Sequence, residues 1–436
     1  MCDFNFRRKT IRHRVLAAIV AAVPLALAPQ GGAAAYTQNP LHAFCTEANC
    51  GDGDTPHAGL LRDASGNLYG TTEKGGKYDS GLVFKLIPNK KKTKYTEHVL
   101  KSFCAKANCA DGGFPEAGLI MDVDGNIYGT TGAGGKYGAG AVFKMTPLAN
   151  GWTYGVIHSF CHDPGCADGS DPTAELAYAG QSSGASWDET SPLFGTTYVG
   201  GANNRGAVYE LSHTGSGWSF TLIHSYDTAF HGGELLVDMS GDLFGTTLLG
   251  GANSAGTLYK LASGSWNETT LHDFCAETNC ADGTQPIGRL LMDSNGNLFG
   301  TASEGGSGAH CQQTAGCGVA YERTAGGKFK VLHDFCSLKN CNDGLYPSAG
   351  LIMGAGGDLL GTTYEGGTGP GGTAFSLDHG NKWAETVIYD FCSAQNCTDG
   401  AGVVTPLIMD ASGDLFGTTA LGGANATGGT VFELTP

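Results

Sequence analysis

The chain is built from short apolar runs that alternate with polar and glycine-rich turns in a fixed order. The first run, as at residues 118–122, is apolar and leads to an Asp-Gly-Asn turn. The second run follows this kind of turn and reads Leu-Tyr-Gly-Thr-Thr at residues 68–72 of another copy. A glycine-rich loop leads to a third run, as at 83–86, and a polar turn leads to a fourth, as at 156–160. Because Asn and Gly accept the positive φ angles of tight hairpins, each copy predicts four short antiparallel strands.

The pattern occurs seven times along the chain. Its most regular part is Gly-Thr-Thr-x-x-Gly-Gly, which begins at Gly70, Gly129, Gly195, Gly245, Gly361 and Gly417, and again at Gly300 with Ala302 in place of the second Thr. Successive copies begin 50 to 66 residues apart. Solenoid repeats are usually shorter, whereas propeller blades with extended loops reach this length.

The two ends of the repeat region complement each other. The chain ends in a run typical of a third strand, 431–434, while residues 40–45 are typical of a fourth strand. The early segment can therefore complete the last blade and close the ring, which removes exposed strand edges at the seam. We predict an all-β fold, a seven-bladed β-propeller of four-stranded blades closed by the N-terminal strand.

The repeat resembles that of the Gloeo/Verruco tandem-repeat family, also called choice-of-anchor GloVer-repeat proteins. The resemblance rests on Gly-Asn-Leu-Tyr-Gly-Thr-Thr, Gly-Gly and Gly-x-Val-Phe in residues 66–84, and it extends over residues 41–436. It implies an exported repeat protein and assigns no activity. Many members carry a C-terminal surface anchor; since this chain ends at its last blade, we expect free secretion or periplasmic residence.

The first 35 residues have the features of a signal peptide. Five basic residues lie between Arg7 and Arg14, an apolar stretch covers 15–28, and Ala33 to Ala35 offer a cleavage site. We therefore expect a signal peptide at 1–35 and a single propeller domain at 36–436. The net charge of −16 excludes nucleic acid and anionic membrane surfaces as favoured partners. No later run is long enough to span a bilayer, and we expect a monomer.

Cysteines follow the fourth run of most copies in Cys-x4-Cys pairs. Removal of residues 1–35 leaves an even number of cysteines after an export signal, which favours disulfides over redox or zinc chemistry. The expected pairs are Cys45/Cys50, Cys104/Cys109, Cys161/Cys166, Cys275/Cys280, Cys336/Cys341, Cys392/Cys397 and, in a longer loop, Cys311/Cys317. The fourth copy is entered through residues 225–227 without cysteines.

Strand alternation places the glycine-rich loops and the cystine loops on one face, here called the cystine face. Binding residues of propellers lie in loops, so we expect the binding surface there. The opposite face carries plain hairpins, apart from a 13-residue insertion near 179–191.

An aspartate stands two residues after the second cysteine of six pairs: Asp52, Asp111, Asp168, Asp282, Asp343 and Asp399. These carboxylates could bind Ca²⁺ or sugar hydroxyls, or each could accept a backbone N–H in an Asx-type turn. We otherwise expect no cofactor. Residues that depart from the repeat are further ligand-binding candidates, namely Asp227 and His231 where cysteines are absent, Glu304 and His310 in the fifth copy, and Tyr198 and Tyr364, which could stack on sugar rings.

Three functions are compatible with this pattern. The first is an extracellular or periplasmic binding module for a glycan or a protein. The second is a glycan lyase or hydrolase in which acids and His310 or His231 converge on the channel. The third is a structural surface repeat without a ligand. Gly180 to Gly184 matches the serine-elbow pattern but lies in a polar insertion, so the sequence leaves open whether the protein is an enzyme.

Overall fold

The computed structural model describes residues 36–181, 184–215, 217–227 and 233–436. The expected signal peptide at 1–35 lies outside the described residues. The described residues form one compact unit. None of the helices in the described ranges is long and apolar enough to cross a membrane.

The compact unit is a ring of seven antiparallel sheets, as predicted. Blades are numbered one to seven in chain order. Blade 1 contains β2 (Leu61–Arg62), β3 (Leu68–Thr72), β4 (Leu82–Pro88) and β5 (Tyr95–Ser102); blade 2 contains β6 (Ile120–Met121), β7 (Ile127–Thr131), β8 (Ala141–Leu148) and β9 (Gly151–Ser159); blade 3 contains β10 (Leu193–Thr197), β11 (Ala207–Thr214) and β12 (Gly217–Ser225).

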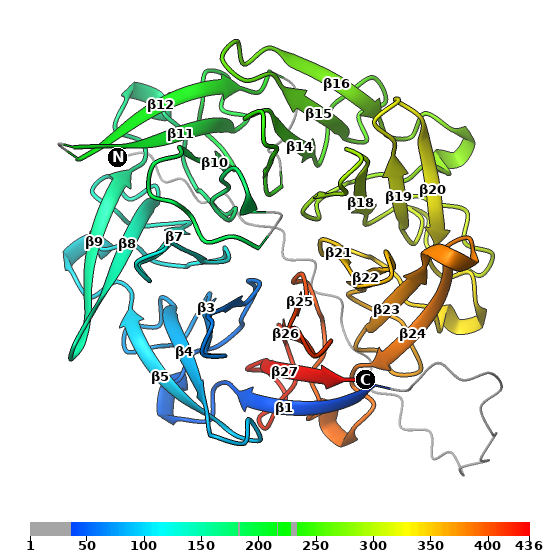
Figure 1. Cartoon of the computed structure of the whole chain (residues 1–436), viewed down its shortest axis with the longest axis horizontal. Coiled ribbons are helices and arrows are strands. Elements are labelled where there is room, and N and C mark those ends of the chain that lie inside the picture. Colours follow the sequence, from blue (N-terminus) through cyan, green and yellow to red (C-terminus); the bar gives the residue numbers. More distant parts are fainter. Residues whose placement is uncertain (1–35, 182–183, 216, 228–232) are drawn as a thin grey trace. The chain divides into compact units, whose positions relative to one another are not determined.

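The remaining blades follow the same order. Blade 4 contains β13 (Leu236–Val237), β14 (Leu243–Thr247), β15 (Thr257–Leu261) and β16 (Glu268–Asp273); blade 5 contains β17 (Leu291–Met292), β18 (Leu298–Ala302), β19 (Val319–Arg323) and β20 (Phe329–Asp334); blade 6 contains β21 (Ile352–Met353), β22 (Leu359–Thr362), β23 (Thr373–Asp378) and β24 (Ala384–Asp390); blade 7 contains β25 (Ile408–Met409), β26 (Leu415–Thr419), β27 (Thr430–Thr435) and β1 (Thr37–Ala43). First strands such as β21 and β25 lie near the centre of the ring, and fourth strands such as β5 and β24 lie at its rim (Figure 1).

Short 3-10 helices supplement the strands. Six of them end at the second cysteine of a pair: η1 (Ala48–Cys50), η2 (Ala107–Cys109), η3 (Pro164–Cys166), η5 (Thr278–Cys280), η6 (Lys339–Cys341) and η8 (Gln395–Cys397). Another, η7 (His379–Asn381), connects β23 to β24.

Blade 3 differs from the other blades in its innermost strand, which is reduced to one bridge between Ala177 and Phe194. The insertion that follows is anchored on both neighbouring blades, because the buried Trp187 packs against Tyr128 of blade 2 and Trp218 of blade 3. Its indole N–H donates to the Ser191 carbonyl at 2.9 Å. Trp187 thus anchors the second half of the insertion to the scaffold.

The ring closes as the two ends of the repeat region predict. Strand β1 lies antiparallel to β27, with Thr37 opposite Thr435 and Ala43 opposite Thr430. The register shifts between Pro40 and His42. The first described strand thus supplies the rim strand of blade 7.

In six of the seven copies the Gly-Thr-Thr motif joins its blade to the next. Gly70 lies opposite Phe84, and a Cβ at Gly70 would lie 2.5 Å from the Phe84 ring. In six of the seven copies the first Thr of the motif donates its hydroxyl to a carbonyl of the following blade, whereas Thr246 Oγ1 of blade 4 has no hydrogen-bond partner among the described residues. These bonds are Thr71 to Ala117, Thr130 to Ala174, Thr196 to Gly233, Thr301 to Ala349, Thr362 to Thr405 and Thr418 to Ala58.

We predict that removal of residues 36–43 destabilises the whole ring. Without β1, strand β27 loses its rim partner and presents unpaired N–H and C=O groups. Compared with a chain beginning at Tyr36, the shortened chain should melt several degrees lower and aggregate more readily, as measured by differential scanning calorimetry and light scattering. Equal melting temperatures would show that closure contributes little.

Candidate functional site

The seven expected cysteine pairs are disulfides. In the six Cys-x4-Cys loops the Cα atoms of the two cysteines are 3.9–4.0 Å apart, and in Cys311–Cys317 they are 5.9 Å apart. Disulfides on this scale indicate a protein that folds in an oxidising compartment. Sequence spacing alone sufficed to predict them.

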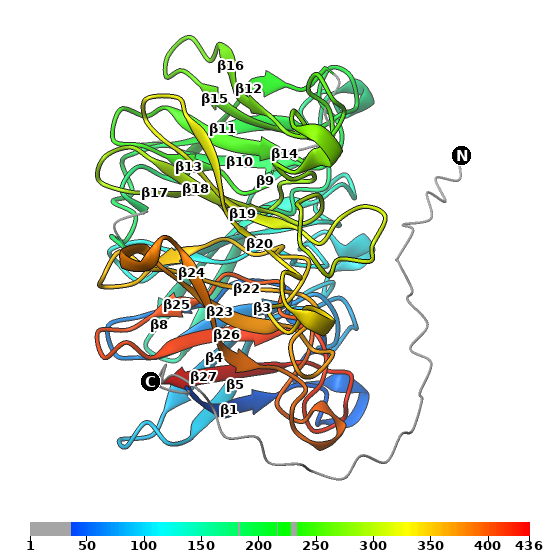
Figure 2. The same cartoon turned by 90° about the vertical axis from the view of Figure 1, so that its right-hand side faces the viewer.

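The glycine-rich loops pack on the cystine loops, as strand alternation predicts. Gly76 N–H donates to the Cys50 carbonyl at 2.9 Å, and Asp54 N–H donates to the Lys74 carbonyl at 3.0 Å. Corresponding bonds recur, for example from Gly135 to Cys109 and from Gly306 to Cys280. In Figure 2 the cystine loops gather on the right-hand side, and the β23–β24 connection lies on the left.

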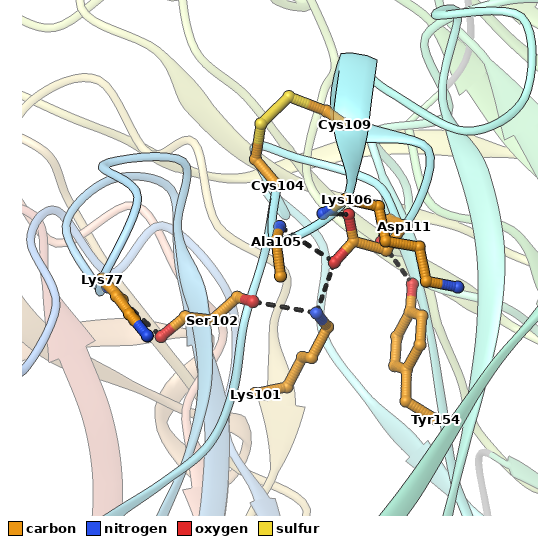
Figure 3. Close-up of polar contacts among 9 residues, drawn as sticks. All are labelled: Lys77, Lys101, Ser102, Cys104, Ala105, Lys106, Cys109, Asp111 and Tyr154. Atoms are coloured by element: carbon orange, nitrogen blue, oxygen red, sulfur yellow. Dashed lines mark hydrogen bonds and ion pairs between the residues drawn. A yellow bond between two sulfur atoms is a disulfide. The ribbon is translucent and has the colours of Figure 1, made fainter.

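The six aspartates of the cystine loops lie beneath these loops. All six are at most 5% exposed: Asp52, Asp111, Asp168, Asp282, Asp343 and Asp399. Figure 3 shows one of them. Asp111 accepts hydrogen bonds from the backbone N–H groups of Ala105 and Lys106 at 3.1 and 3.0 Å, and from Lys101 Nζ at 2.5 Å. Burial alone would raise the pKa of Asp111, but these bonds hold it below its usual value.

Rim strands supply further partners for the same aspartates. His272 Nε2 lies 2.9 Å from Asp282, His333 Nε2 lies 3.5 Å from Asp343, and Tyr389 donates its hydroxyl to Asp399 at 2.9 Å. Together with the backbone N–H bonds, these contacts hold each cystine loop against its rim strand. They favour the Asx-type interpretation over binding of sugar hydroxyls or Ca²⁺.

The residues that depart from the repeat lie at several separate places. Tyr198 and Tyr364 directly follow Gly-Thr-Thr on the cystine face; Tyr198 is 38% exposed, and Tyr364 packs on Gly402. Glu304 accepts from Gln285 at 2.5 Å. Exposed His310 donates its backbone N–H to the Cys336 carbonyl, and Asp227 accepts from Asn203 at 2.7 Å. His231 lies outside the described residues.

The side-chain clusters whose donor atoms are close enough to hold a metal ion contain disulfide-bonded cysteines. In the part of the chain that the structure describes, these groups are Cys317 with Cys336 and Cys341, and Cys45 with Cys50 and Asp54. Since a disulfide sulfur carries no thiolate, neither group offers the ligands that zinc prefers.

Three charged residues occupy equivalent positions at the start of successive inner strands, and sequence reasoning missed them. They are Glu175, Glu234 and Arg289, which stand where the other copies have Gly59, Gly118, Gly350 and Pro406. We call these seven positions the axial ring. Its charged members break the Ala-Gly-Leu pattern of the repeat, and alignment of the copies would have revealed them.

The axial ring brings the charges of blades 3, 4 and 5 together. Arg289 Nη1 lies 3.3 Å from Glu175 Oε1, and Gln181 Nε2 donates to the same oxygen at 2.6 Å. A Cβ at Gly118 would collide with Glu175 Oε2, so the glycine of blade 2 makes room for the glutamate of blade 3. Glu234 Oε2 is buried and, within the described residues, has no hydrogen-bond partner.

Burial dominates the electrostatics of this cluster. It raises the pKa of Glu175 to about 7, with Arg289 opposing the rise and Glu234 adding to it. Burial likewise raises the pKa of Glu234 against the attraction of Arg289. A buried carboxyl with a pKa near neutrality can hold or release a proton under physiological conditions.

A separate pocket of about 440 Å³ lies between blades 3 and 4. Its apolar lining includes Trp266, Phe194 and Val237, and Ala179 and Pro192 from the two ends of the insertion. Its polar lining comes from Glu210, Ser263 and the backbone of Gly241 and Gly264. The rings of Trp266 and Phe194 meet edge to face at 5.6 Å. We call this the blade 3–4 pocket.

The blade 3–4 pocket does not lie on the cystine face. Gly241 lies in the hairpin between β13 and β14, and Ser263, Gly264 and Trp266 lie in the turn between β15 and β16. Because strands alternate direction, both connections belong to the opposite face. Our expectation that the binding surface lies on the cystine face therefore finds no support from this pocket.

We predict that Asp282→Ala lowers stability by about 3 kcal/mol, because the N–H groups of Ala276 and Glu277 and the His272 ring lose their buried acceptor. Urea unfolding measures the change. Asp282→Asn, which keeps one acceptor oxygen, should lose less. Equal losses for the two variants would contradict the hydrogen-bonding role.

We also predict a pH-dependent effect of Glu175→Gln. Since the pKa of Glu175 is raised in the folded protein from 4.5 to about 7, its stabilising contribution is fully present below about pH 4.5 and is lost as the pH rises through about 7. The variant should therefore gain up to about 3 kcal/mol relative to the wild type between pH 4.5 and 8. Thermal unfolding at several pH values measures this gain, with Glu322→Gln as control; a pH-independent difference would refute it.

Comparison with solved structures supports the fold. The extracellular domain of a protein assigned to the hybrid two-component systems of B. thetaiotaomicron is 10% identical with a TM-score of 0.54; the match covers 90% of this chain and 39% of that one. A fungal alcohol oxidase of the AA5 family, solved in complex with copper, is 12% identical with a TM-score of 0.51, covering 92% of this chain and 77% of that one. At these identities the likeness concerns the fold alone. No functionally curated protein matches the chain.

The model of the Gloeobacter/Verrucomicrobia repeat matches residues 29–187 and 178–314. These two matches cover more than half of the chain and include the Gly-Thr-Thr motifs from Gly70 to Gly300. The chain therefore belongs to the Gloeobacter/Verrucomicrobia repeat family.

Proposed function

We propose that the protein is an exported binding module that holds a glycan in the blade 3–4 pocket. The observation that carries this proposal is the composition of the pocket wall. An aromatic floor of Trp266 and Phe194 stands beside the carboxylate of Glu210 and the hydroxyl of Ser263. Sugars combine apolar ring faces with hydroxyl groups, so aromatic stacking and a few polar partners suit them.

The size and rigidity of the pocket support the same function. A volume of about 440 Å³ falls in the range of small-ligand sites. One wall is formed by the insertion, which Trp187 anchors against Tyr128 and Trp218. A wall that is already fixed before binding lowers the entropic cost of holding a ligand.

Export is part of this proposal. The seven disulfides require an oxidising compartment to form and persist, and the basic and apolar pattern of residues 1–35 provides a route to it. We propose secretion to the cell exterior or periplasm as a monomer. The pocket needs no cofactor, so we expect glycan binding to be unaffected by a chelator.

Glycan cleavage is a second candidate function. Glu175 and Glu234 are adjacent carboxyl groups whose pKa values are both raised by burial, and a carboxylic acid paired with a carboxylate is the usual machinery of glycoside hydrolysis. His57 Nδ1 also lies 3.4 Å from Glu73 Oε2 on the cystine face. The release of reducing ends from a bound polysaccharide, abolished by Glu234→Gln, would favour this alternative.

We predict that Trp266→Ala weakens the binding of glycans. A glycan array identifies a ligand for the wild type, and isothermal titration calorimetry then compares variants. Loss of one stacking ring should weaken binding by roughly tenfold. Trp383→Ala is the matched control, because Trp383 packs on Phe299 of blade 5 as Trp266 packs on Phe194 of blade 3. Unchanged binding by Trp266→Ala, or no ligand on the array, would reject the proposed site.

A further inference from the structure

We propose that the blade 3–4 pocket selects a ligand with a positively charged amino group, namely an amino sugar. This inference rests on the proposed function and names the substrate class of the same pocket. It comes from a comparison of equivalent positions in neighbouring blades, where the protein itself places an ammonium group over the ring that corresponds to Phe194.

In three blades a lysine of the third strand covers the aromatic residue of the second strand. Lys85 Nζ lies 5.1 Å from the centre of the Tyr69 ring, Lys144 Nζ lies 5.2 Å from that of Tyr128, and Lys260 Nζ lies 5.5 Å from that of Phe244. Each lysine stands directly opposite its aromatic partner in the strand register. These are cation–π geometries.

Two of these lysines also form an ion pair with a carboxylate. Lys144 Nζ lies 3.6 Å from Glu189 Oε1, and Lys260 Nζ lies 2.5 Å from Asp242 Oδ2. An ammonium group held between an aromatic face and a carboxylate is therefore part of how this repeat is built.

Blade 3 has an aromatic ring opposite a glutamate in place of lysine, as do blades 5 and 7, where Phe299 faces Glu322 and Phe416 faces Glu433. Glu210 stands opposite Phe194, at the position that lysine occupies in blades 1, 2 and 4. The described residues that line the pocket include no Lys, Arg or His. Glu210 Oε1 accepts a hydrogen bond from Ser212 Oγ at 2.7 Å, which fixes the carboxylate at the pocket wall.

A ligand ammonium group would take the place that the missing lysine leaves. It would pair with Glu210 beside the edge of the Phe194 ring, which is 4% exposed, while its sugar ring stacks on Trp266. The net charge of −16 also attracts cationic ligands to the protein. An N-acetylated sugar of the same size keeps the stacking face but has no charge to pair with Glu210, and the inference therefore predicts discrimination between the two.

The test compares two tetrasaccharides that differ only in N-acetylation, the β-1,4 glucosamine tetramer and the N-acetylglucosamine tetramer, by isothermal titration calorimetry on the full mature chain. We expect the wild type to bind the glucosamine tetramer roughly five- to tenfold more tightly. The preference should shrink when NaCl is raised from about 0.05 to 0.5 M, because salt screens the pairing.

Variants of Glu210 locate the preference in this pocket. Glu210→Gln should bind both tetramers alike, and Glu210→Lys should lose the glucosamine tetramer, since the new side chain supplies the ammonium itself. Glu322→Gln and Glu322→Lys are matched controls, because Glu322 stands opposite Phe299 at the same register position of blade 5. Both controls should behave as the wild type, and circular dichroism checks that all four variants are folded.

Several results would overturn the inference. Equal affinity of the wild type for both tetramers, or a preference that persists in Glu210→Gln, would show that charge is not selected. Tetralysine binding as tightly as the glucosamine tetramer in a Glu210-dependent manner would show that the pocket takes a peptide ammonium and no sugar. If a neutral glycan binds in a Trp266-dependent manner, the proposed function stands and only this inference fails; if no glycan binds, the proposed function itself fails.

Discussion

The glycine of the second strand is the constraint on which the rest of the structure depends. At Gly70, Gly129 and Gly361, a Cβ would lie 2.5–2.7 Å from the phenylalanine ring of the third strand. The missing side chain lets a large ring lie flat across the sheet. The next residue, a threonine, then donates a hydrogen bond to the following blade. The motif thus fills its own blade and in six copies binds the next. Ring closure allows the last blade to do the same, because Thr418 donates to the Ala58 carbonyl of blade 1.

The features that the sequence predicted are those in which each copy repeats the same local chemistry. Blade number, closure by β1 and the seven disulfides follow from short-range spacing, because strands, hairpins and Cys-x4-Cys loops are local structures. The role of the six aspartates stayed open at that stage. An aspartate before glycine suits both a turn and a ligand site, and only its burial and its bonds to the loop, as at Asp111, distinguish the two.

The blade 3–4 pocket and the axial ring were beyond sequence reasoning for a geometric reason. Phe194, Glu210 and Trp266 belong to two blades, and Glu175, Glu234 and Arg289 belong to three. Their meeting depends on how neighbouring blades pack, which no spacing within one copy reveals. The departures themselves were visible, since Glu210 replaces a recurrent lysine and Glu175 replaces glycine. Their equivalence becomes clear only when the copies are superposed strand by strand.

Comparison of equivalent positions distinguishes charged residues that recur in many copies from those found in only a few. A charge that recurs at one position in many copies is neutralised within the blade: the cystine-loop aspartates hold loop N–H groups, and Lys85, Lys144 and Lys260 cover aromatic rings. A charge at which the copies differ has partners that the other copies lack: Glu175 contacts Arg289 and Gln181, and Glu210 accepts from Ser212. Glu210 and Glu175 are of this kind, and the same insertion serves both, because Ala179 and Pro192 line the pocket while Gln181 donates to Glu175. The insertion therefore links the two places where the repeat departs from its own pattern.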